Sequence, residues 1–266
     1  MAINTFKPSL WEQALLEKFK GICVADLITT APSSVEGTKA IFNSIALSKG
    51  VQDYAGTIDY EDINSASKEL VYNKKKYVAY KIDDVDAAQA VADVMMPMAR
   101  DMAYDLKRVI DAAVFDAITA SDSGVAKLTN AGTGKTPSIY ELIVDLGTVL
   151  DENDVPEQDR FIICRPETVN ELAKDEHVID NTLVLPNGVV QGMQVNGMQV
   201  IKTTACPENK VIVMHKSAVG YGKQIDKMEA LRLEGSFSDA IRLLLVFGVS
   251  VLRPTAAAYY TISESQ

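Results

Sequence analysis

A glycine-rich stretch that carries a lysine is the first part of this sequence that could do chemistry. It reads TNAGTGKTPS, from Thr129 to Ser138. A phosphate-binding loop has a glycine, four residues and then Gly-Lys-Ser/Thr, and it lies between a buried strand and a helix that begins at the lysine. Here Thr129 stands in the place of the first glycine, and Pro137 disfavours helical geometry at Thr136. The stretch predicts a loop, and a nucleotide hydrolase is only a remote alternative.

The other side chains that commonly act in catalysis or metal binding are few and scattered. Neither His177 nor His215 has a second ligand at metal spacing, and no Gly-x-Ser-x-Gly or His-Glu-x-x-His pattern occurs. The acidic run DENDVPEQD fits a solvated loop better than paired catalytic carboxylates. An odd number of widely spaced cysteines predicts reduced thiols: Cys23, Cys164 and Cys206. We therefore expect no catalytic residue, no cofactor, no metal and no enzyme activity.

Composition and charge narrow the class of protein. The 266 residues are 47% hydrophobic and 23% charged, enough for one large domain or two modest ones. A net charge of −10 argues against a general nucleic-acid-binding surface, and the clearest basic cluster is Lys74, Lys75 and Lys76. The first residues lack a signal-peptide pattern, and the longest apolar run, LLLVFGVSVL, is too short for a membrane helix. We expect no membrane association.

The first 120 residues predict elements that a monomer buries poorly. Residues 1–50 hold a short amphipathic helix around Trp11 to Phe19 and otherwise form an arm. Next come two strands, TIDYEDI and KELVYNKKKYVAYKID, joined by the polar link NSASK into a hairpin that is marginal alone. Helical spacing then reaches about Ala120, and Pro97 should kink or divide this helix near Met96. Its predicted inward stripe is Val91, Met95, Met98, Met102, Leu106, Val109 and Ala113.

The second half predicts a helix followed by many strands. Ser138 and Glu141 form a capping box, RFIICR reads as a buried strand, and Pro166 suits the first turn of a helix. Asn187-Gly188 and Asn196-Gly197 predict hairpin turns near the strands MQVIKT and KVIVMH. Apolar residues at every odd position from 241 to 251 predict one unusually long strand. A long helix and a long strand together indicate an elongated, plate-like subunit.

Four segments, in this order, resemble the major capsid proteins of tailed bacteriophages. KKYVAYKIDDVDAAQA is similar to the stretch that joins the extended loop to the spine helix, and VPEQDRFIICRPETVNELAKD to the entry of the axial domain. GVVQGMQVNGMQVIKTTACP resembles the glycine-punctuated hairpin region of that domain. LLLVFGVSVLRPTAAAYYTI resembles the long terminal strand and its Arg-Pro turn. The resemblance covers most of the chain from about Val51 onward.

The resemblance implies an α+β fold of the Hong Kong 97 type, with an N-terminal arm, an extended β-hairpin loop, a long spine helix, a peripheral domain and an axial domain. We expect the arm at 1–50, the extended loop (E-loop) at 51–83, the spine helix and peripheral domain at 84–150, and the axial domain at 151–240. Residues 241–266 would be the long strand that returns to the peripheral domain.

The implied function is that of a major capsid protein, a subunit that self-assembles through pentamers and hexamers into an icosahedral head around the phage genome. Its partners would be copies of itself, with portal, scaffolding and decoration proteins possible, and it would enclose DNA without sequence-specific binding. It would belong to the virion and assemble in the host cytoplasm. The alternative is an encapsulin-like nanocompartment shell that holds an enzyme cargo. Our candidate intersubunit contacts are Lys74, Lys75, Lys76, Tyr77, Tyr60 and Trp11.

Overall fold

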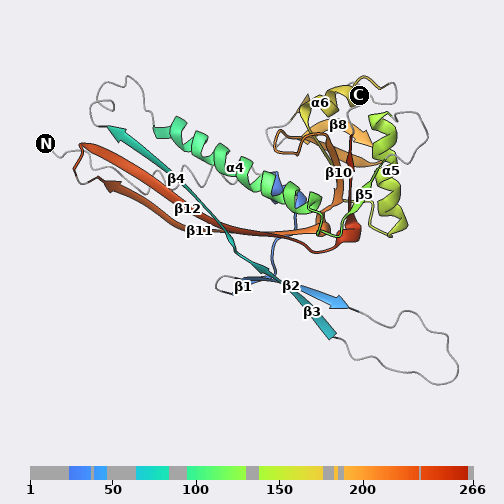
Figure 1. The fold of residues 1–266 in the computed structure, drawn as a ribbon, viewed down its shortest axis with the longest axis horizontal. Helices are drawn as coiled ribbons and strands as arrows, with labels where there is room; N and C mark the ends of the chain where they lie inside the picture. Colours follow the sequence, from blue (N-terminus) through green and yellow to red (C-terminus); the bar gives the residue numbers. More distant parts are fainter. Residues whose placement is uncertain are drawn as a thin grey trace.

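The computed structural model describes residues 24–36, 39–46, 64–83, 95–129, 138–175, 183–184, 189–233 and 235–262. Figure 1 shows an elongated molecule in which a long sheet and helix α4 run side by side, a second body carries α5 and α6, and a hairpin projects away from both.

The long sheet has three antiparallel strands in the order β11-β12-β4: Val219–Arg232, Ser238–Val251 and Lys74–Asp83. The long strand predicted at 241–251 is confirmed as the central strand β12, and its 14 residues span about 46 Å. Ile241, Leu243, Leu245 and Phe247 alternate along one face and are almost fully buried. That face forms a core with α4.

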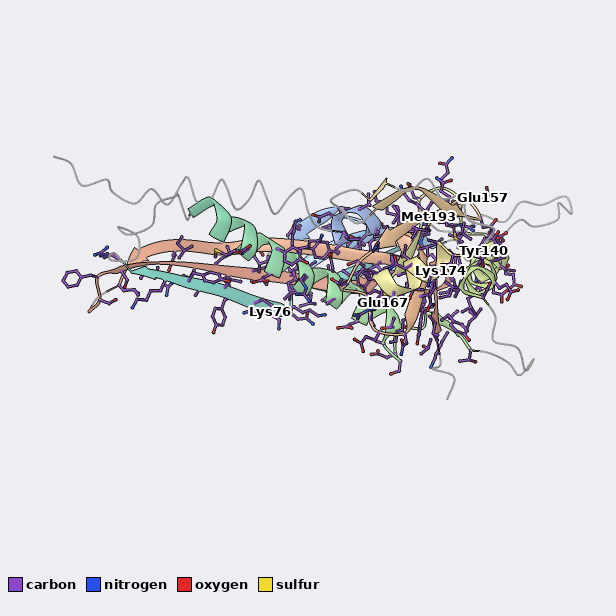
Figure 2. All side chains as sticks on the ribbon, turned by 90° about the horizontal axis from the view of Figure 1, so that it is seen from above. Lys76, Tyr140, Glu157, Glu167, Lys174 and Met193 are labelled. Carbon is purple, nitrogen blue, oxygen red and sulfur yellow. The ribbon has the colours of Figure 1, made fainter. Side chains whose placement is uncertain are left out.

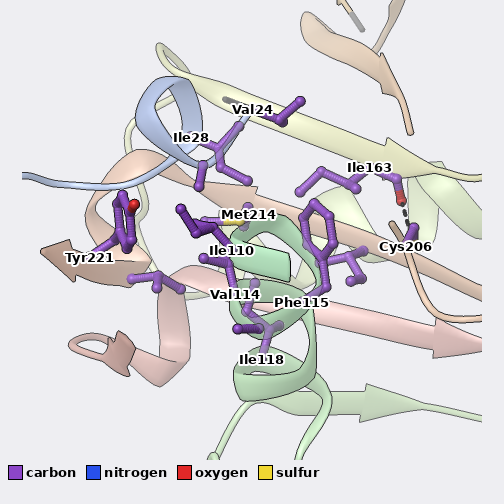
Figure 3. Close-up of a cluster of buried hydrophobic side chains, with 14 of the residues drawn as sticks. Val24, Ile28, Ile110, Val114, Phe115, Ile118, Ile163, Cys206, Met214 and Tyr221 are labelled. Carbon is purple, nitrogen blue, oxygen red and sulfur yellow. Dashed lines mark hydrogen bonds between the residues drawn. The ribbon is translucent and has the colours of Figure 1, made fainter. Parts of the chain in front are cut away.

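Helix α4, Met95–Thr119, packs its apolar stripe on this sheet. Met102, Leu106 and Ala113 are buried as predicted, but Val109 is exposed and Ile110 takes the inward place. The reason is helical geometry, because Ile110, Val114 and Ile118 continue the i+4 row from Leu106, as Figure 3 shows for those three. Pro97 lies in the first turn of the described helix. The kink predicted near Met96 falls at the first described residues of α4 and stays a prediction, and Val91 lies outside the described residues.

The second body is built on a seven-stranded sheet of order β5-β13-β10-β6-β9-β8-β7. In that order its strands are Ala126–Leu128, Ala257–Thr261, Lys210–His215, Arg160–Cys164, Met198–Lys202, Val189–Val195 and Leu183–Val184. Both faces of its centre are covered. Phe161 and Ile163 enter the α4 core, whereas Ile162 and Cys164 pack with α5, Ile139–Glu152, and α6, Pro166–Leu172. Two-sided burial explains why RFIIC shows no polar alternation.

Several local predictions in this body are confirmed. Ser138 accepts a hydrogen bond from the Glu141 amide at 3.2 Å, and the Glu141 carboxylate accepts one from the Ser138 amide at 2.9 Å. Pro166 opens α6. Asn196 and Gly197 join β8 to β9 with φ values of +50° and +75°, as a tight hairpin turn requires. Asn187-Gly188 lies outside the described residues.

The extended hairpin differs from the prediction. Strand β3, Asn64–Val71, pairs with β2, Lys39–Ala46, and β2 also pairs with the short β1, Ser34–Glu36. The predicted link NSASK therefore lies inside a strand, part of the predicted arm is hairpin, and TIDYEDI lies outside the described residues. The predicted strand 68–83 is also two strands. Between β3 and β4 the chain passes from the sheet β1-β2-β3 to the long sheet, and Tyr72 is buried at this crossing.

Sheet membership crosses the expected domain boundaries. Strand β11 lies within the expected axial segment but pairs with β12 in the long sheet. Helix α5 lies mostly within the expected peripheral segment but packs on the seven-stranded sheet. Strand β13, near the end of the chain, also joins the seven-stranded sheet.

Candidate assembly interface

The two cysteines that the structure describes lie inside hydrophobic cores. Cys164 and Cys206 are free and buried, and burial raises the pKa of Cys206 to about 12 and that of Cys164 still further. The Cys206 thiol faces the Ile163 carbonyl oxygen at 3.9 Å (Figure 3). Within the described ranges, no group of three or more His, Cys, Asp or Glu side chains could hold a metal ion. Cys23 and His177 lie outside those ranges.

His215 ends strand β10 and caps the short 3-10 turn Lys216–Ala218. Its Nδ1 atom accepts a hydrogen bond from the Ser217 amide at 3.1 Å. Burial lowers its pKa, and so do the nearby Arg160 and Arg253, although Asp159 acts in the opposite direction. At neutral pH the His215 imidazole is therefore uncharged, and its Nδ1 atom caps the turn.

The glycine-rich stretch is followed by the predicted helix start. Helix α5 begins at Ile139 with Ser138 as its N-cap, so the start falls after Lys135 and Thr136. A phosphate-binding loop would place these two residues at the helix start. Residues 130–137 themselves lie outside the described residues.

The predicted basic cluster lies on strand β4, at one edge of the long sheet. Lys74, Lys75, Lys76 and Tyr77 stand opposite Phe247, Val246, Leu245 and Leu244 of β12. Directly opposite residues share a face, so Lys74 and Lys76 lie on the α4 side whereas Lys75 and Tyr77 lie on the other side. Figure 2 shows Lys76 along the long sheet, well apart from Tyr140 and Glu157 of the second body.

This edge is open to solvent. Tyr77 is 78% exposed, Lys75 and Lys76 are exposed, and Lys74 is half-buried. In the part of the chain that the structure describes, no acidic side chain pairs with any of the three lysines, and β4 has a strand neighbour on one side only. The structure thus brings four of the six predicted contact residues together on one strand. Tyr60 and Trp11 lie outside the described residues.

The root of the hairpin is fastened to the far face of the long sheet. Ala40, Phe42, Leu70 and Tyr72 form a small core with Val246 of β12. The backbones approach closely here: an added Cβ at Gly248 would lie 2.6 Å from the Val71 carbonyl oxygen, and one at Gly222 would lie 2.7 Å from the Tyr72 hydroxyl. Lys68 also donates to the Val251 carbonyl at 2.6 Å. The root is fixed by packing, and the distal hairpin extends beyond it (Figure 1).

Sequence reasoning missed two exposed features. Phe237, at the turn between β11 and β12, is 82% exposed. A pocket of about 350 Å³ opens beside the hairpin root, where Tyr72 and Tyr221 meet the segment after α2, Ala25–Ile28. The run EGSFS did signal a turn with an isolated aromatic residue, but no sequence pattern marks the pocket, because its walls come from residues 26–35, 72 and 216–223, which lie far apart in the sequence. Among the described helices, none is long and apolar enough to cross a membrane.

Comparisons with known proteins agree with this architecture. The family model described as phage capsid protein matches residues 67–260, well over half of the chain. A search of curated proteins found no match. Solved structures share the fold at low sequence identity. A structure from Mycobacterium phage Che8 is 21% identical with a TM-score of 0.62, and 85% of each chain is covered.

Two further structures extend the same result. The capsid structure of cyanophage P-SCSP1u is 21% identical with a TM-score of 0.65, covering 90% of this chain and 88% of that one. A virus-like particle from Pyrococcus furiosus is 18% identical with a TM-score of 0.64, covering 97% and 100%. The expected α+β capsid fold of the Hong Kong 97 type is confirmed, and the matched residues 67–260 show that the chain belongs to the phage capsid protein family.

Proposed function

We propose that this capsid subunit assembles with copies of itself, through pentamers and hexamers, into a closed icosahedral head around the phage genome. The observation that carries the proposal is the family match over residues 67–260, on a fold whose hairpin β2–β3 is packed on the long sheet at its root. Shell subunits need large surfaces that fit other copies, and closed symmetry repeats each contact many times. The subunit would act without catalysis and without sequence-specific DNA contacts, and it would assemble in the host cytoplasm.

The proposed parts follow the sheets. The long sheet with α4 would be the peripheral domain with its spine helix, and the seven-stranded sheet with α5 and α6 would be the axial domain. The hairpin β2–β3 would be the E-loop and would reach a neighbouring subunit. Lys74, Lys75, Lys76 and Tyr77 would contact a neighbour from the β4 edge, and Tyr60 and Trp11 would do so from the E-loop and the arm.

Sedimentation velocity of the purified protein tests this proposal. Capsomers or shells should sediment far ahead of the 28.9 kDa chain at micromolar concentration. A single 28.9 kDa species at every salt and protein concentration would contradict self-assembly. A scaffold, portal or decoration protein would be found as a co-purifying partner when the neighbouring phage genes are expressed together.

The second candidate is a nanocompartment that holds an enzyme cargo. The similar Pyrococcus furiosus particle is the observation that keeps it in view, although the family match favours a phage head. Neighbouring genes separate the two, because a head requires portal and terminase genes and a nanocompartment requires a cargo gene. An ATP-binding assay addresses the remote alternative of a nucleotide hydrolase, and we expect neither binding nor any effect of Lys135→Ala on assembly.

A further inference from the structure

The pocket beside the hairpin root has the volume and the largely apolar lining that an aromatic side chain needs. Its volume is about 350 Å³, and apolar groups of Pro32, Val35, Tyr72 and Tyr221 line it. Val35 is 54% exposed. Asp26, Thr29, Thr30, Lys216 and Lys223 add polar groups to the lining, and Ala31 and Gly222 complete it. Figure 3 shows Tyr221 beside the turn of α2 that carries Ile28.

The walls of this pocket are held in place before anything binds. Lys223 Nζ lies 2.6 Å from Asp26 Oδ2 and 5.9 Å from the centroid of the Tyr221 ring. The Thr30 amide donates to the Val219 carbonyl at 2.9 Å, and the Tyr221 amide donates to the Thr30 carbonyl at 3.2 Å. A preformed apolar pocket with a charged rim is the setting in which a single aromatic side chain contributes most to binding.

Phe237 projects from the turn between β11 and β12. The Leu233 amide donates to the Ser238 carbonyl at 3.1 Å, and the Ser236 and Ser238 hydroxyls lie 2.5 Å apart. Gly235 supplies the φ of +90° that the turn requires. Ser238 is fully buried whereas its neighbour Phe237 is 82% exposed, so the turn directs the Phe237 ring into solvent.

Phe237 cannot reach the pocket of its own chain. The pocket is lined by Tyr221 and Lys223 near the start of β11, and Phe237 follows the end of that strand at Arg232. About ten extended residues, roughly 33 Å, separate the two places. Figure 1 shows the turn between β11 and β12 at one end of the molecule and the hairpin root near its middle.

We propose that Phe237 of one copy inserts into the pocket between Tyr72 and Tyr221 of a second copy. The contact joins two different surfaces of the same chain, so it is heterologous and must close by symmetry, as a shell allows. This inference rests on the proposed self-assembly. It adds a specific anchor that links the far end of one long sheet to the root of another subunit's hairpin, and it would fix the direction in which that hairpin leaves.

Cysteine cross-linking between two differently tagged chains tests the contact directly. One chain carries Val35→Cys, the other carries Phe237→Cys, and the assembled mixture is oxidised and mapped by mass spectrometry. We expect a disulfide between positions 35 and 237 of different chains. The matched control replaces Phe237→Cys with Tyr104→Cys, an exposed aromatic position on α4 that should not cross-link to position 35.

Two single variants give an independent readout. Phe237→Ser should raise the protein concentration needed for assembly about tenfold, as loss of an aromatic anchor does. Val35→Trp, which would fill the pocket, should have the same effect, and the double variant should be no worse than either. Tyr104→Ser should assemble like the parent. Equal melting temperatures of the unassembled chains show that the variants fold.

Failure of the proposed function and failure of this inference would give different results. If the parent chain never assembles, the proposed function fails. If the parent forms shells but Phe237→Ser forms them equally well, or position 237 cross-links only to position 237 of another copy, the inference is wrong while the proposed function stands.

Discussion

At the scale of single residues, glycine decides how the hairpin meets the long sheet. Gly220, Gly222 and Gly248 lie where Phe42, Tyr72 and the Val71 backbone approach β11 and β12. A side chain at these positions would enter space that a ring or a carbonyl already occupies. The close approach fixes the start of the hairpin, and it could not be foreseen because the sequence does not say which glycine faces which neighbour.

Gly248→Ala should therefore be costly. Its Cβ would lie 2.6 Å from the Val71 carbonyl oxygen, which is backbone and cannot move alone, so we expect a loss of roughly 1–3 kcal/mol in the free energy of unfolding. The matched control is Gly147→Ala in α5, where the new Cβ would meet only the flexible ends of Met198 and Asn196 and alanine favours the helix. Urea unfolding of the unassembled subunit measures both. Equal stability of the two variants would contradict this account of the hairpin root.

His215 should give the subunit a specific pH dependence. Its folded-state pKa is lowered from about 6.5, so the unfolded chain binds a proton more readily. Its contribution to stability is complete above about pH 6.5 and is lost as the pH falls below that value. His215→Asn keeps an acceptor for the Ser217 amide but does not titrate. We expect its melting temperature to fall less than that of the parent between pH 7.5 and 5.5, and an identical fall would rule out this role.

At the scale of elements, the best predictions were those of helices and strands that have a regular sequence signal. Strand β12 was predicted from its apolar residues at odd positions, and α5 from Ser138 and Glu141. The start of β3 was missed because its residues NSASK are mostly small and polar, so the sequence shows no apolar alternation there. The basic cluster was identified from the sequence. Because side chains alternate along β4, Lys75 lies on the opposite face of the sheet from Lys74 and Lys76.

The lysines of β4 allow two interpretations that salt can separate. Lysine on an exposed edge strand also prevents unwanted strand pairing. If Lys74, Lys75 and Lys76 contact an acidic neighbour, changing all three to Gln should weaken assembly at low salt and have little effect at high salt, where screening already removes the attraction. Light scattering against salt concentration measures this. The control changes Lys127, Lys174 and Lys202 of the second body to Gln. If both triple variants assemble with the same salt dependence, the β4 lysines serve only to prevent unwanted strand pairing.

The distal hairpin should be needed for assembly but not for folding. Deleting residues 58–75 would remove Leu70 and Tyr72, which are buried in the root, so the shortening must begin further out. Replacing residues 44–66 with Asn-Gly joins the paired residues Asn43 and Ser67 directly and leaves the root intact. We expect a cooperative melt without shells. Closed particles from this variant would show that the hairpin is not an intersubunit element.

At the scale of the whole molecule, the elongated shape is the main physical argument for assembly. A sheet whose central strand has 14 residues, an open β4 edge, an exposed Phe237 and a projecting hairpin all present surface that a second copy could cover. The second body is, by contrast, packed on both faces of its sheet. The resemblance of the sequence predicted this fold, but surfaces such as the pocket at Tyr72 and Tyr221 became visible only when distant segments were placed together.

Negative-stain electron microscopy of the purified chain tests the central claim most directly. The account predicts closed, hollow particles of uniform diameter, formed by this protein alone or together with a scaffold from the same gene cluster. Dispersed monomers under every assembly condition, with or without such a scaffold, would contradict it.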